Sequence, residues 1–321
     1  MHEQFELRQI QTNGVELRIA EKGDGPLVVL VHGWPELWYS WRHQIGPLAA
    51  AGYRVVAPDV RGYGGSAKPH PVEAYAMTEL MADLTGLIDA LGEEKAILVG
   101  HDWGAPICWN TAALRPDKVA AIAALSVPYR KRTAVSQIDI WQKIYAGKFF
   151  YQVYFQDEGT VEAEVEADMR TALRKIYYSI SGDAPSLDSW LDRHAEGGLL
   201  DAMVDPDPFP SWMTPADMDY FVSAFEAGGF RGPINRYRNQ RRDFENLPDM
   251  NAAPVQQPSC FIAGEKDVVR RFVPGRDVYE GIEENCTDFR FKRIIPGAGH
   301  WVQQEAPAAV NEALLEFLAG L

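Results

Sequence analysis

Short apolar runs alternate with helical patterns along most of this chain, and this alternation limits the folds that the chain can adopt. Three helical patterns, at residues 78–91, 105–114 and 308–318, lie between or after the runs. Strands that are apolar on both faces are typical of a parallel sheet that helices cover on both sides. We therefore predict an α/β fold with a mostly parallel sheet and helices on both faces. The apolar runs that lead into turns rich in Gly, Pro, Asp and His are 27–31, 54–57, 96–99, 119–125, 259–263 and 291–295.

The alternation stops between about residues 129 and 245, where the chain shows helical patterns only and many aromatic residues. We predict three parts: a core segment at 1–128, an inserted all-helical cap at 129–245, and a second core segment at 246–321. Within the cap, the segment 214–217 (TPAD) predicts a helix start, because it offers an N-cap hydroxyl, Pro at N1 and an acid at N3. Because open α/β sheets bind ligands at the carboxyl ends of their strands, the cap would lie over that edge as a lid.

The charge balance and the cysteines narrow the class of protein. With 31 basic and 45 acidic residues the net charge is -14, which argues against nucleic acid and against anionic membranes as partners. Cys108, Cys260 and Cys286 are widely spaced and form no C-x-x-C pair, so we expect no disulfide framework, no metal site and a reducing compartment. Residues 1–10 carry charges and lack the apolar region of a signal peptide. We expect a cytoplasmic protein, either a monomer or a homodimer.

The segment 99–105 (VGHDWGA) has the pattern of a nucleophile elbow. A predicted strand enters it, a predicted helix leaves it, and small residues flank Asp102 at positions −2, +2 and +3, as the tight turn requires. The alternative is that Asp102 is only the N-cap of the following helix. A carboxylate with a pKa near about 3.9 is ionised at neutral pH. It can therefore displace a leaving group from an sp³ carbon and form an ester with the substrate.

Hydrolysis of such an ester needs a base, and His300 is the candidate among the seven histidines. It follows the last predicted strand in a Gly-rich loop, so the chain order is nucleophile, acid, base, as an α/β-hydrolase requires. The acid should end the preceding strand, where Glu265 and Asp267 are available. We favour Asp267, because a turn beginning at Gly264 would place it opposite His300, and we keep Glu265 as the alternative.

An oxyanion hole is predicted after the strand at 27–31. The backbone N–H of Trp34, in the segment 32–35 (HGWP), paired with that of Trp103, would stabilise a tetrahedral oxyanion. We expect Trp34–Pro35 to be a cis bond, since Pro lowers the cost of that isomer. An ordinary strand-ending turn is the alternative. The Gly-rich segment 61–66 (RGYGGS) lacks the spacing and the Lys-Ser/Thr ending of a phosphate loop, so we reject that function for it.

Taken together, the motifs resemble those of the epoxide hydrolases of the α/β-hydrolase fold, over nearly the whole chain. This resemblance implies that two cap tyrosines, Tyr151 and Tyr237, hold and protonate the epoxide oxygen. Tyr154 is the alternative to Tyr151, and packing within the cap is the alternative function of all three. The segments that carry the resemblance are 32–36 (HGWPE), 100–104 (GHDWG), 264–267 (GEKD) and 297–301 (GAGHW), with cap contexts at 149–156 and 229–239.

The activity that the resemblance implies is the cofactor-independent addition of water to an epoxide, which gives a vicinal diol. The aromatic cap favours an apolar epoxide as the small-molecule partner. A haloalkane or haloacid dehalogenase with the same Asp nucleophile is an alternative, although Trp34 stands where haloalkane dehalogenases commonly have Asn. A ligand-binding protein that keeps the pocket without the chemistry is the other alternative.

Overall fold

A single sheet organises the computed structural model, which describes residues 5–185 and 193–321. Within these residues the sheet has eight strands in the order β1-β2-β4-β3-β5-β6-β7-β8. Strands β3 to β8 are parallel to one another, whereas β2 runs antiparallel to its neighbours β1 and β4. The predicted mostly parallel sheet is therefore confirmed. The strands are β1 (Glu6–Thr12), β2 (Val15–Lys22), β3 (Leu27–Val31), β4 (Arg54–Pro58), β5 (Ala96–His101), β6 (Val119–Leu125), β7 (Val255–Gly264) and β8 (Cys286–Ile295).

The antiparallel hairpin β1–β2 is the part of the sheet that apolar runs did not predict. β1 is an edge strand whose side chains are mostly exposed or half-buried, so it lacks an apolar run. Its turn, Asn13–Gly14, has positive φ at both residues (43° and 73°), which is the backbone of the Asn-Gly hairpin turn. That dipeptide was the available signal. β7 and β8 also begin earlier than predicted, because their first halves contain polar residues.

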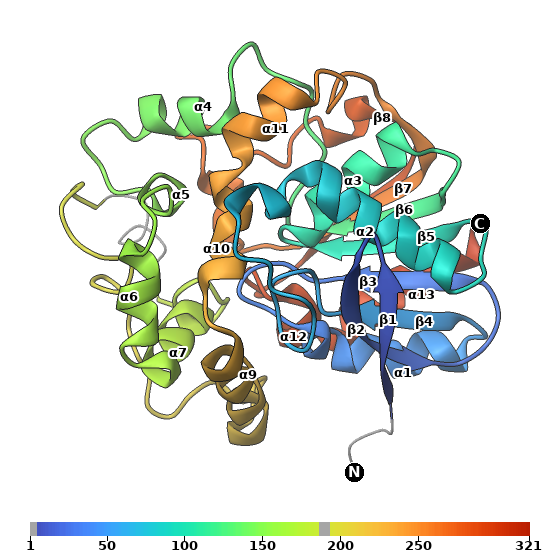
Figure 1. Cartoon of the computed structure of the whole chain (residues 1–321), viewed down its shortest axis with the longest axis horizontal. Helices are drawn as coiled ribbons and strands as arrows, with labels where there is room; N and C mark the ends of the chain where they lie inside the picture. The colour runs from blue at the N-terminus through green and yellow to red at the C-terminus, as the bar shows by residue number, and fades with distance from the viewer. Residues whose placement is uncertain (1–4, 186–192) are drawn as a thin grey trace.

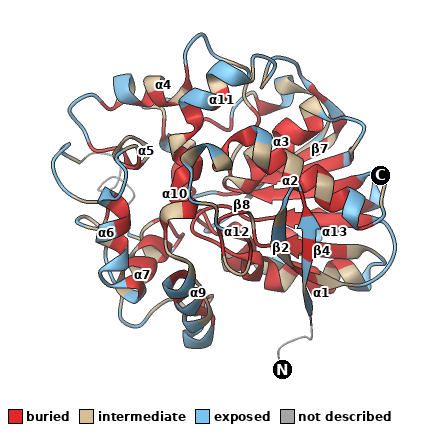
Figure 2. Ribbon diagram, in the orientation of Figure 1, coloured by how far each residue is buried: buried red, intermediate tan, exposed pale blue. Residues whose placement is uncertain are grey.

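Helices cover both faces of the sheet (Figures 1 and 2). The helices α1 (Arg42–Ala50) and α13 (Pro307–Ala319) pack together on one face. The helices α2 (Met77–Ala90) and α3 (Gly104–Leu114) pack on the other. Strands β3, β5 and β6 are buried along almost their whole length, which explains why they read as continuous apolar runs. The short helices of the core are η1 (Trp38–Trp41), η2 (Val72–Tyr75), η3 (Val268–Arg271), η4 (Ile282–Asn285) and α12 (Val302–Glu305).

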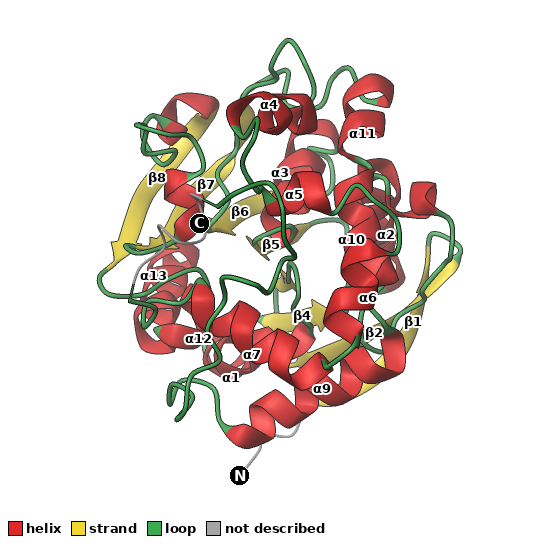
Figure 3. Cartoon of the chain, turned by 90° about the vertical axis from the view of Figure 1, so that its left-hand side faces the viewer, coloured by secondary structure: helices red, strands yellow, loops and turns green. Residues whose placement is uncertain are grey.

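The chain between β6 and β7 forms a layer of helices on one side of the core (Figures 1 and 3). α9 begins at the predicted N-cap residue, Thr214. The Thr214 side chain accepts from the Asp217 N–H, and the Asp217 side chain accepts from the Thr214 N–H. The domain limits at 128/129 and 245/246 stay predictions, and residues 186–192 of the predicted cap lie outside the described residues. The cap helices are α4 (Gln137–Ile144), α5 (Tyr151–Tyr154), α6 (Thr160–Glu166), α7 (Met169–Ser179), α9 (Pro215–Gly228), α10 (Arg231–Arg238) and α11 (Gln240–Asn246).

Membrane-spanning helices and cysteines are the two features of the described residues that bear on the class of protein. None of their helices is both long enough and apolar enough to cross a bilayer. Cys108, Cys260 and Cys286 are free thiols in the fold, and the first two are buried. Residues 1–4 of the N-terminal segment lie outside the described part of the chain.

Candidate active site

Asp102 occupies a sharp turn between the end of β5 and the start of α3. Its φ is +49°, a value that non-glycine residues seldom adopt. The turn fits because its neighbours are small: a Cβ at Gly100 would collide with the carbonyl of Gly104, and one at Gly104 with the carbonyl of Val31. This backbone holds the Asp102 side chain above the carboxyl end of the sheet, as expected of a nucleophile elbow.

Both carboxylate oxygens of Asp102 lie beside groups from other loops. The Trp34 N–H donates to Oδ1 at 2.8 Å, and Oδ2 lies 3.5 Å from Nε2 of His300. A Cβ on Gly33 would collide with the Asp102 side chain and with the peptide nitrogen of Trp103. Only glycine therefore lets the loop after β3 approach the elbow closely enough for the Trp34 amide to reach this carboxylate. The second predicted amide donor, that of Trp103, stays a prediction. The predicted cis bond at Trp34–Pro35 is confirmed.

His300 and Asp267 meet at the ends of β8 and β7. Nδ1 of His300 lies 3.1 Å from Oδ1 of Asp267. Burial would lower the pKa of His300, but the carboxylates of Asp267 and Asp102 together raise it well above its usual value. Burial has the opposite effect on Asp267, but the His300 imidazole outweighs it and holds the pKa of Asp267 below its usual value. The free site therefore favours a charged imidazolium between two carboxylates.

Asp267 is in turn held by groups that no sequence motif pointed to. The Tyr279 hydroxyl lies 2.8 Å from Asp267 Oδ2 and 2.7 Å from the carbonyl of Ser126, and the Val269 N–H donates to Oδ1 at 2.9 Å. Glu265, the alternative acid, is exposed and instead accepts from the Gly297 N–H at 3.1 Å. The structure thus brings Asp267, and not Glu265, to His300.

A second buried pair, His101 and Glu36, lies next to His300. Nδ1 of His101 lies 2.6 Å from Oε2 of Glu36, and its Nε2 lies 2.8 Å from the carbonyl of His300. Burial would raise the pKa of Glu36, but His101 outweighs burial and lowers that pKa to about 2. The pair therefore holds the backbone carbonyl of His300 in place. Glu36 belongs to the quoted 32–36 motif, but its pairing across the sheet edge could not be read from spacing.

Tyr151 and Tyr237 lie together over the elbow, with ring centroids 5.7 Å apart. Both are buried. Burial and the neighbouring Asp102 carboxylate raise the pKa of each phenol well above its usual value, so both keep their protons. The amide of Gln152 donates to the Tyr151 hydroxyl at 2.8 Å. Tyr154 lies elsewhere, because its hydroxyl donates to Glu164 at 2.9 Å.

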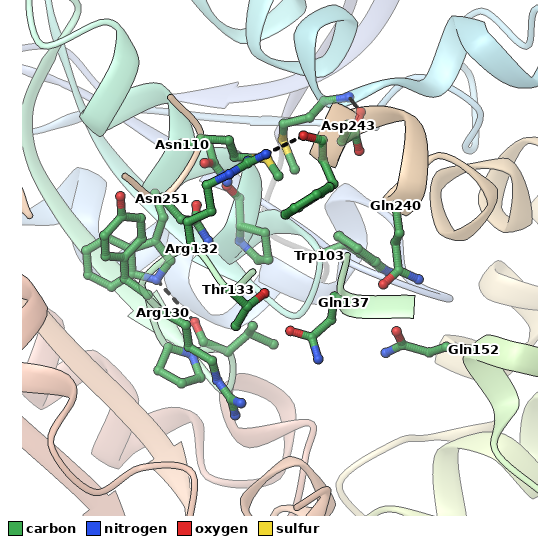
Figure 4. A pocket seen from close by; sticks show the side chains of 18 of the residues that line it. Trp103, Asn110, Arg130, Arg132, Thr133, Gln137, Gln152, Gln240, Asp243 and Asn251 are labelled. Atoms are coloured by element: carbon green, nitrogen blue, oxygen red, sulfur yellow. Dashed lines mark hydrogen bonds between the residues drawn. The ribbon is translucent and has the colours of Figure 1, made fainter. Parts of the chain in front are cut away.

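A cavity of about 210 Å³ opens beside these groups, between the cap and the carboxyl ends of the strands (Figure 4). Asp102, Trp103 and Tyr151 form part of its wall. The guanidinium of Arg236 lies 4.8 Å from the centre of the Trp103 ring and pairs with Asp243, both of which also line the cavity. Other lining residues include Met77, Trp109, Asn110, Arg130, Arg132, Thr133, Gln137, Trp141, Gln152, Gln240, Phe244, Asn251 and Phe272.

The fold and this site together define an α/β-hydrolase: a parallel sheet, an elbow after β5, and a base and an acid after the last two strands. A family model for the alpha/beta hydrolase fold matches residues 26–307. Epoxide hydrolase A of Mycobacterium tuberculosis is 43% identical over 98% of this chain and 97% of its own. Epoxide hydrolase B of the same organism is 39% identical over 92% of each chain.

Solved structures agree with these relatives. Epoxide hydrolase A from Mycobacterium thermoresistibile has a TM-score of 0.93 and 42% identity over 99% of both chains. An epoxide hydrolase from an endophytic Streptomyces has a TM-score of 0.94 and 43% identity, and covers 98% of this chain and 96% of its own. The chain belongs to the epoxide hydrolases of the α/β-hydrolase fold. The predicted fold and activity class are thereby confirmed, and these relatives do not favour the dehalogenase or the ligand-binding alternative.

Proposed function

We propose that this epoxide hydrolase forms a covalent ester on Asp102. The observation that carries the proposal is the position of the Asp102 carboxylate, which lies within reach of an amide donor, the candidate base and the cavity. Since the Trp34 N–H donates to Oδ1, Oδ2 is the freer oxygen and attacks a ring carbon of the epoxide. The C–O bond of the ring breaks, and its electron pair goes to the epoxide oxygen.

Tyr151 and Tyr237 hold and protonate that oxygen. Their phenols keep their protons at neutral pH, and an alkoxide is basic enough to take one during ring opening. The Gln152 amide donates to the Tyr151 hydroxyl, and a phenol that accepts such a hydrogen bond still carries its own proton. Replacing one tyrosine by Phe should slow ester formation about 10- to 100-fold, and replacing both should nearly stop it.

Hydrolysis of the ester uses the groups on the other side of the carboxylate. His300 removes a proton from water, whose oxygen attacks the carbonyl carbon of the ester, while Asp267 orients the imidazole. When the tetrahedral intermediate collapses, the bond between this carbon and Oδ2 breaks. The product oxygen takes the proton from His300, which releases the diol and restores the Asp102 carboxyl group. In that intermediate Oδ1 is the oxyanion, which the Trp34 N–H that already donates to it would stabilise. The Trp103 N–H is the second donor that we propose.

Esterification also removes the negative charge of Asp102, and with it part of what holds His300 protonated. This change lowers the pKa of His300 and so favours the neutral imidazole that can accept a proton from water.

The substrate that we propose is an epoxide with an apolar body. Trp103, Trp141, Phe244 and Phe272 line the cavity and offer apolar and aromatic surface near the reacting carboxylate. We further propose that the enzyme works in the cytoplasm, which its three free cysteines support. We propose that it does so as a monomer or a homodimer.

Trapping the ester tests the mechanism. His300→Ala should still react with an epoxide and then stall, so that intact-protein mass spectrometry finds the protein heavier by one whole epoxide. Asp102→Ala should show no adduct and no diol formation while its thermal unfolding stays cooperative. An unmodified His300→Ala protein after long incubation would exclude the covalent route.

Epichlorohydrin separates the epoxide reaction from dehalogenation, because it carries both an epoxide and a carbon–chlorine bond. We expect the chlorodiol at early times without free chloride. Prompt chloride without diol would assign the chemistry to carbon–halogen cleavage. A bulkier aryl epoxide, styrene oxide, serves as the parallel substrate.

A further inference from the structure

Glu305, the last residue of α12, places its carboxylate among three backbone N–H groups. Its Oε2 accepts from Gly182 at 2.7 Å and from Gly299 at 2.8 Å, and its Oε1 accepts from Trp301 at 2.9 Å. Gly299 and Trp301 are the two chain neighbours of His300, whereas Gly182 follows the cap helix α7. One carboxylate thus joins both sides of the base to the cap.

The segments that Glu305 joins are in direct backbone contact. The His300 N–H donates to the carbonyl of Ile180 at 2.9 Å. A Cβ at Gly182 would collide with the carbonyl of Gly297, and one at Gly299 with the peptide nitrogen of Gly182. Two glycines are therefore needed for the base loop and the cap to approach this closely. The ammonium of Lys266 donates to the carbonyl of Gly182 at 2.7 Å and closes the contact from the side of β7.

We propose that Glu305 is a positioning residue, which fixes the loop of His300 against cap residues 180–182 and so orients the base for ester hydrolysis. The inference rests on the covalent mechanism proposed above. The His300 ring packs against the rings of His101 and Trp301. Its nitrogens lie 3.1 Å from the Asp267 carboxylate and 3.5 Å from that of Asp102. The latter is already long for a hydrogen bond. A loop that contains Gly297 and Gly299 has backbone freedom that these contacts alone do not remove.

The electrostatic cost of burying Glu305 agrees with a role in positioning His300. Burial raises its pKa to about 7, although the three backbone hydrogen bonds act in the opposite direction, and the nearby Asp267 adds to the increase. Placing a carboxylate there is costly compared with leaving it in water. Two of the three hydrogen bonds go to the chain neighbours of His300 and the third goes to the cap. A buried carboxylate with these partners points to precise placement of the base.

The two half-reactions separate a positioning role from a general structural one. Ester formation depends on Asp102 and the cap tyrosines, and ester hydrolysis depends on His300. In single-turnover reactions with styrene oxide, we expect Glu305→Ala to slow ester hydrolysis about 10- to 100-fold, as small misplacements of catalytic groups do. Ester formation should stay within about twofold, so the alkylated enzyme should accumulate. Quenched samples report the ester by intact mass and the diol by chromatography.

A conservative variant keeps the test valid if Glu305→Ala folds poorly. Glu305→Gln retains the size and one carbonyl acceptor, so it should restore part of the hydrolysis rate. Glu265→Gln is the matched control, because Glu265 is an exposed carboxylate that accepts one N–H of the same loop, that of Gly297. We expect both half-reactions of this control to match the wild type within about twofold, as for surface changes in general.

The outcomes separate the two proposals. An equal loss in both half-reactions of the folded Glu305 variants, or no loss in either, would overturn the positioning role. His300→Ala is measured in parallel, because it must accumulate ester if the covalent route holds. Its failure to do so would refute the covalent mechanism and the positioning role with it, whereas ester in His300→Ala and wild-type behaviour in both Glu305 variants would remove the positioning role alone.

Discussion

His300 lies between two carboxylates, and its charge therefore depends on whether Asp102 is free or esterified. The raised pKa of His300 has its cause in Asp267 and Asp102, against the effect of burial. This raised pKa determines how the stability of the fold depends on pH. The charged imidazole stabilises the folded chain fully below the unfolded pKa of about 6.5, and this contribution is lost as the pH rises through the higher folded value.

Asp102→Asn should lower the pKa of His300, because it removes one of the two negative charges without changing the size of the side chain. The shift should be downward, since the carboxylate oxygen that raises this pKa lies 3.5 Å from the imidazole. Histidine resonances followed by NMR against pH measure this, with His300→Gln for assignment. An unchanged pKa in Asp102→Asn would show that Asp267 alone sets the charge of the base.

Tyr279 supplies a second prediction at this scale. Its hydroxyl lies 2.8 Å from Asp267, so Tyr279→Phe removes a hydrogen bond from the acid while it keeps the ring. We expect the free energy of unfolding to fall by about 1–2 kcal/mol and ester hydrolysis to slow. Denaturant unfolding and single-turnover rates report the two effects. Wild-type values for both would mean that the Val269 N–H and His300 are sufficient to hold Asp267.

The sequence predicted the residues that follow apolar strands and did not predict the residues that support them. Asp102, Asp267 and His300 each stand just after such a run, so their position at one sheet edge follows from the parallel arrangement. Tyr279 stands in a segment without apolar periodicity, and its partner is known only once the chain has folded. The same is true of the contact between His101 and Glu36, which joins two loops from neighbouring strands.

At the scale of elements, the elbow depends on backbone approach. A Cβ at Gly104 would collide with the carbonyl of Val31 in β3, so Gly104→Ala forces α3 away from the sheet. We expect a loss of about 1–3 kcal/mol in the free energy of unfolding, together with a strong loss of activity, because Asp102 moves with the turn.

Gly320→Ala, at the end of α13, is the matched control for Gly104→Ala. Gly320 has an ordinary negative φ and the same change would meet only normal contacts, at 3.4 Å or more. Its unfolding midpoint should equal that of the wild type in thermal scans. If Gly104→Ala were equally stable and active, the elbow would be more tolerant than its contacts imply.

The N-terminal hairpin shows what apolar runs do not predict at the scale of elements. The turn Asn13–Gly14 indicates this hairpin, whereas the hydrophobicity of its strands does not.

At the scale of the whole molecule, a buried ion pair connects the cap with the core. Arg42 in α1 lies 3.0 Å from Asp217 in α9, and the Tyr39 hydroxyl donates to the same carboxylate at 2.9 Å. Arg42→Met leaves Asp217 buried without its cation, which should cost about 3–5 kcal/mol. Arg170→Met is the control, because the Arg170–Asp219 pair joins two cap helices at the exposed surface and should matter by less than about 1 kcal/mol.

Denaturant unfolding followed by tryptophan fluorescence compares these variants. A single shifted transition in Arg42→Met would show that cap and core unfold together. Two separated transitions would show that the pair is what makes them unfold as one unit. Equal stability of the Arg42 and Arg170 variants would remove the ion pair from the account of how the cap is held.

The insertion of the cap between two neighbouring strands also has a consequence during synthesis. β6 ends at Leu125 and its parallel partner β7 begins at Val255, so a ribosome must translate the whole cap before the sheet can continue. A nascent chain that has already exposed the Asp102 turn has neither Asp267 nor His300, and β6 presents an open edge. Such an edge can pair with other chains. The emerging polypeptide therefore presents this open edge for the time that translation of the cap takes, and the proposed catalytic residues come together only with its last strands.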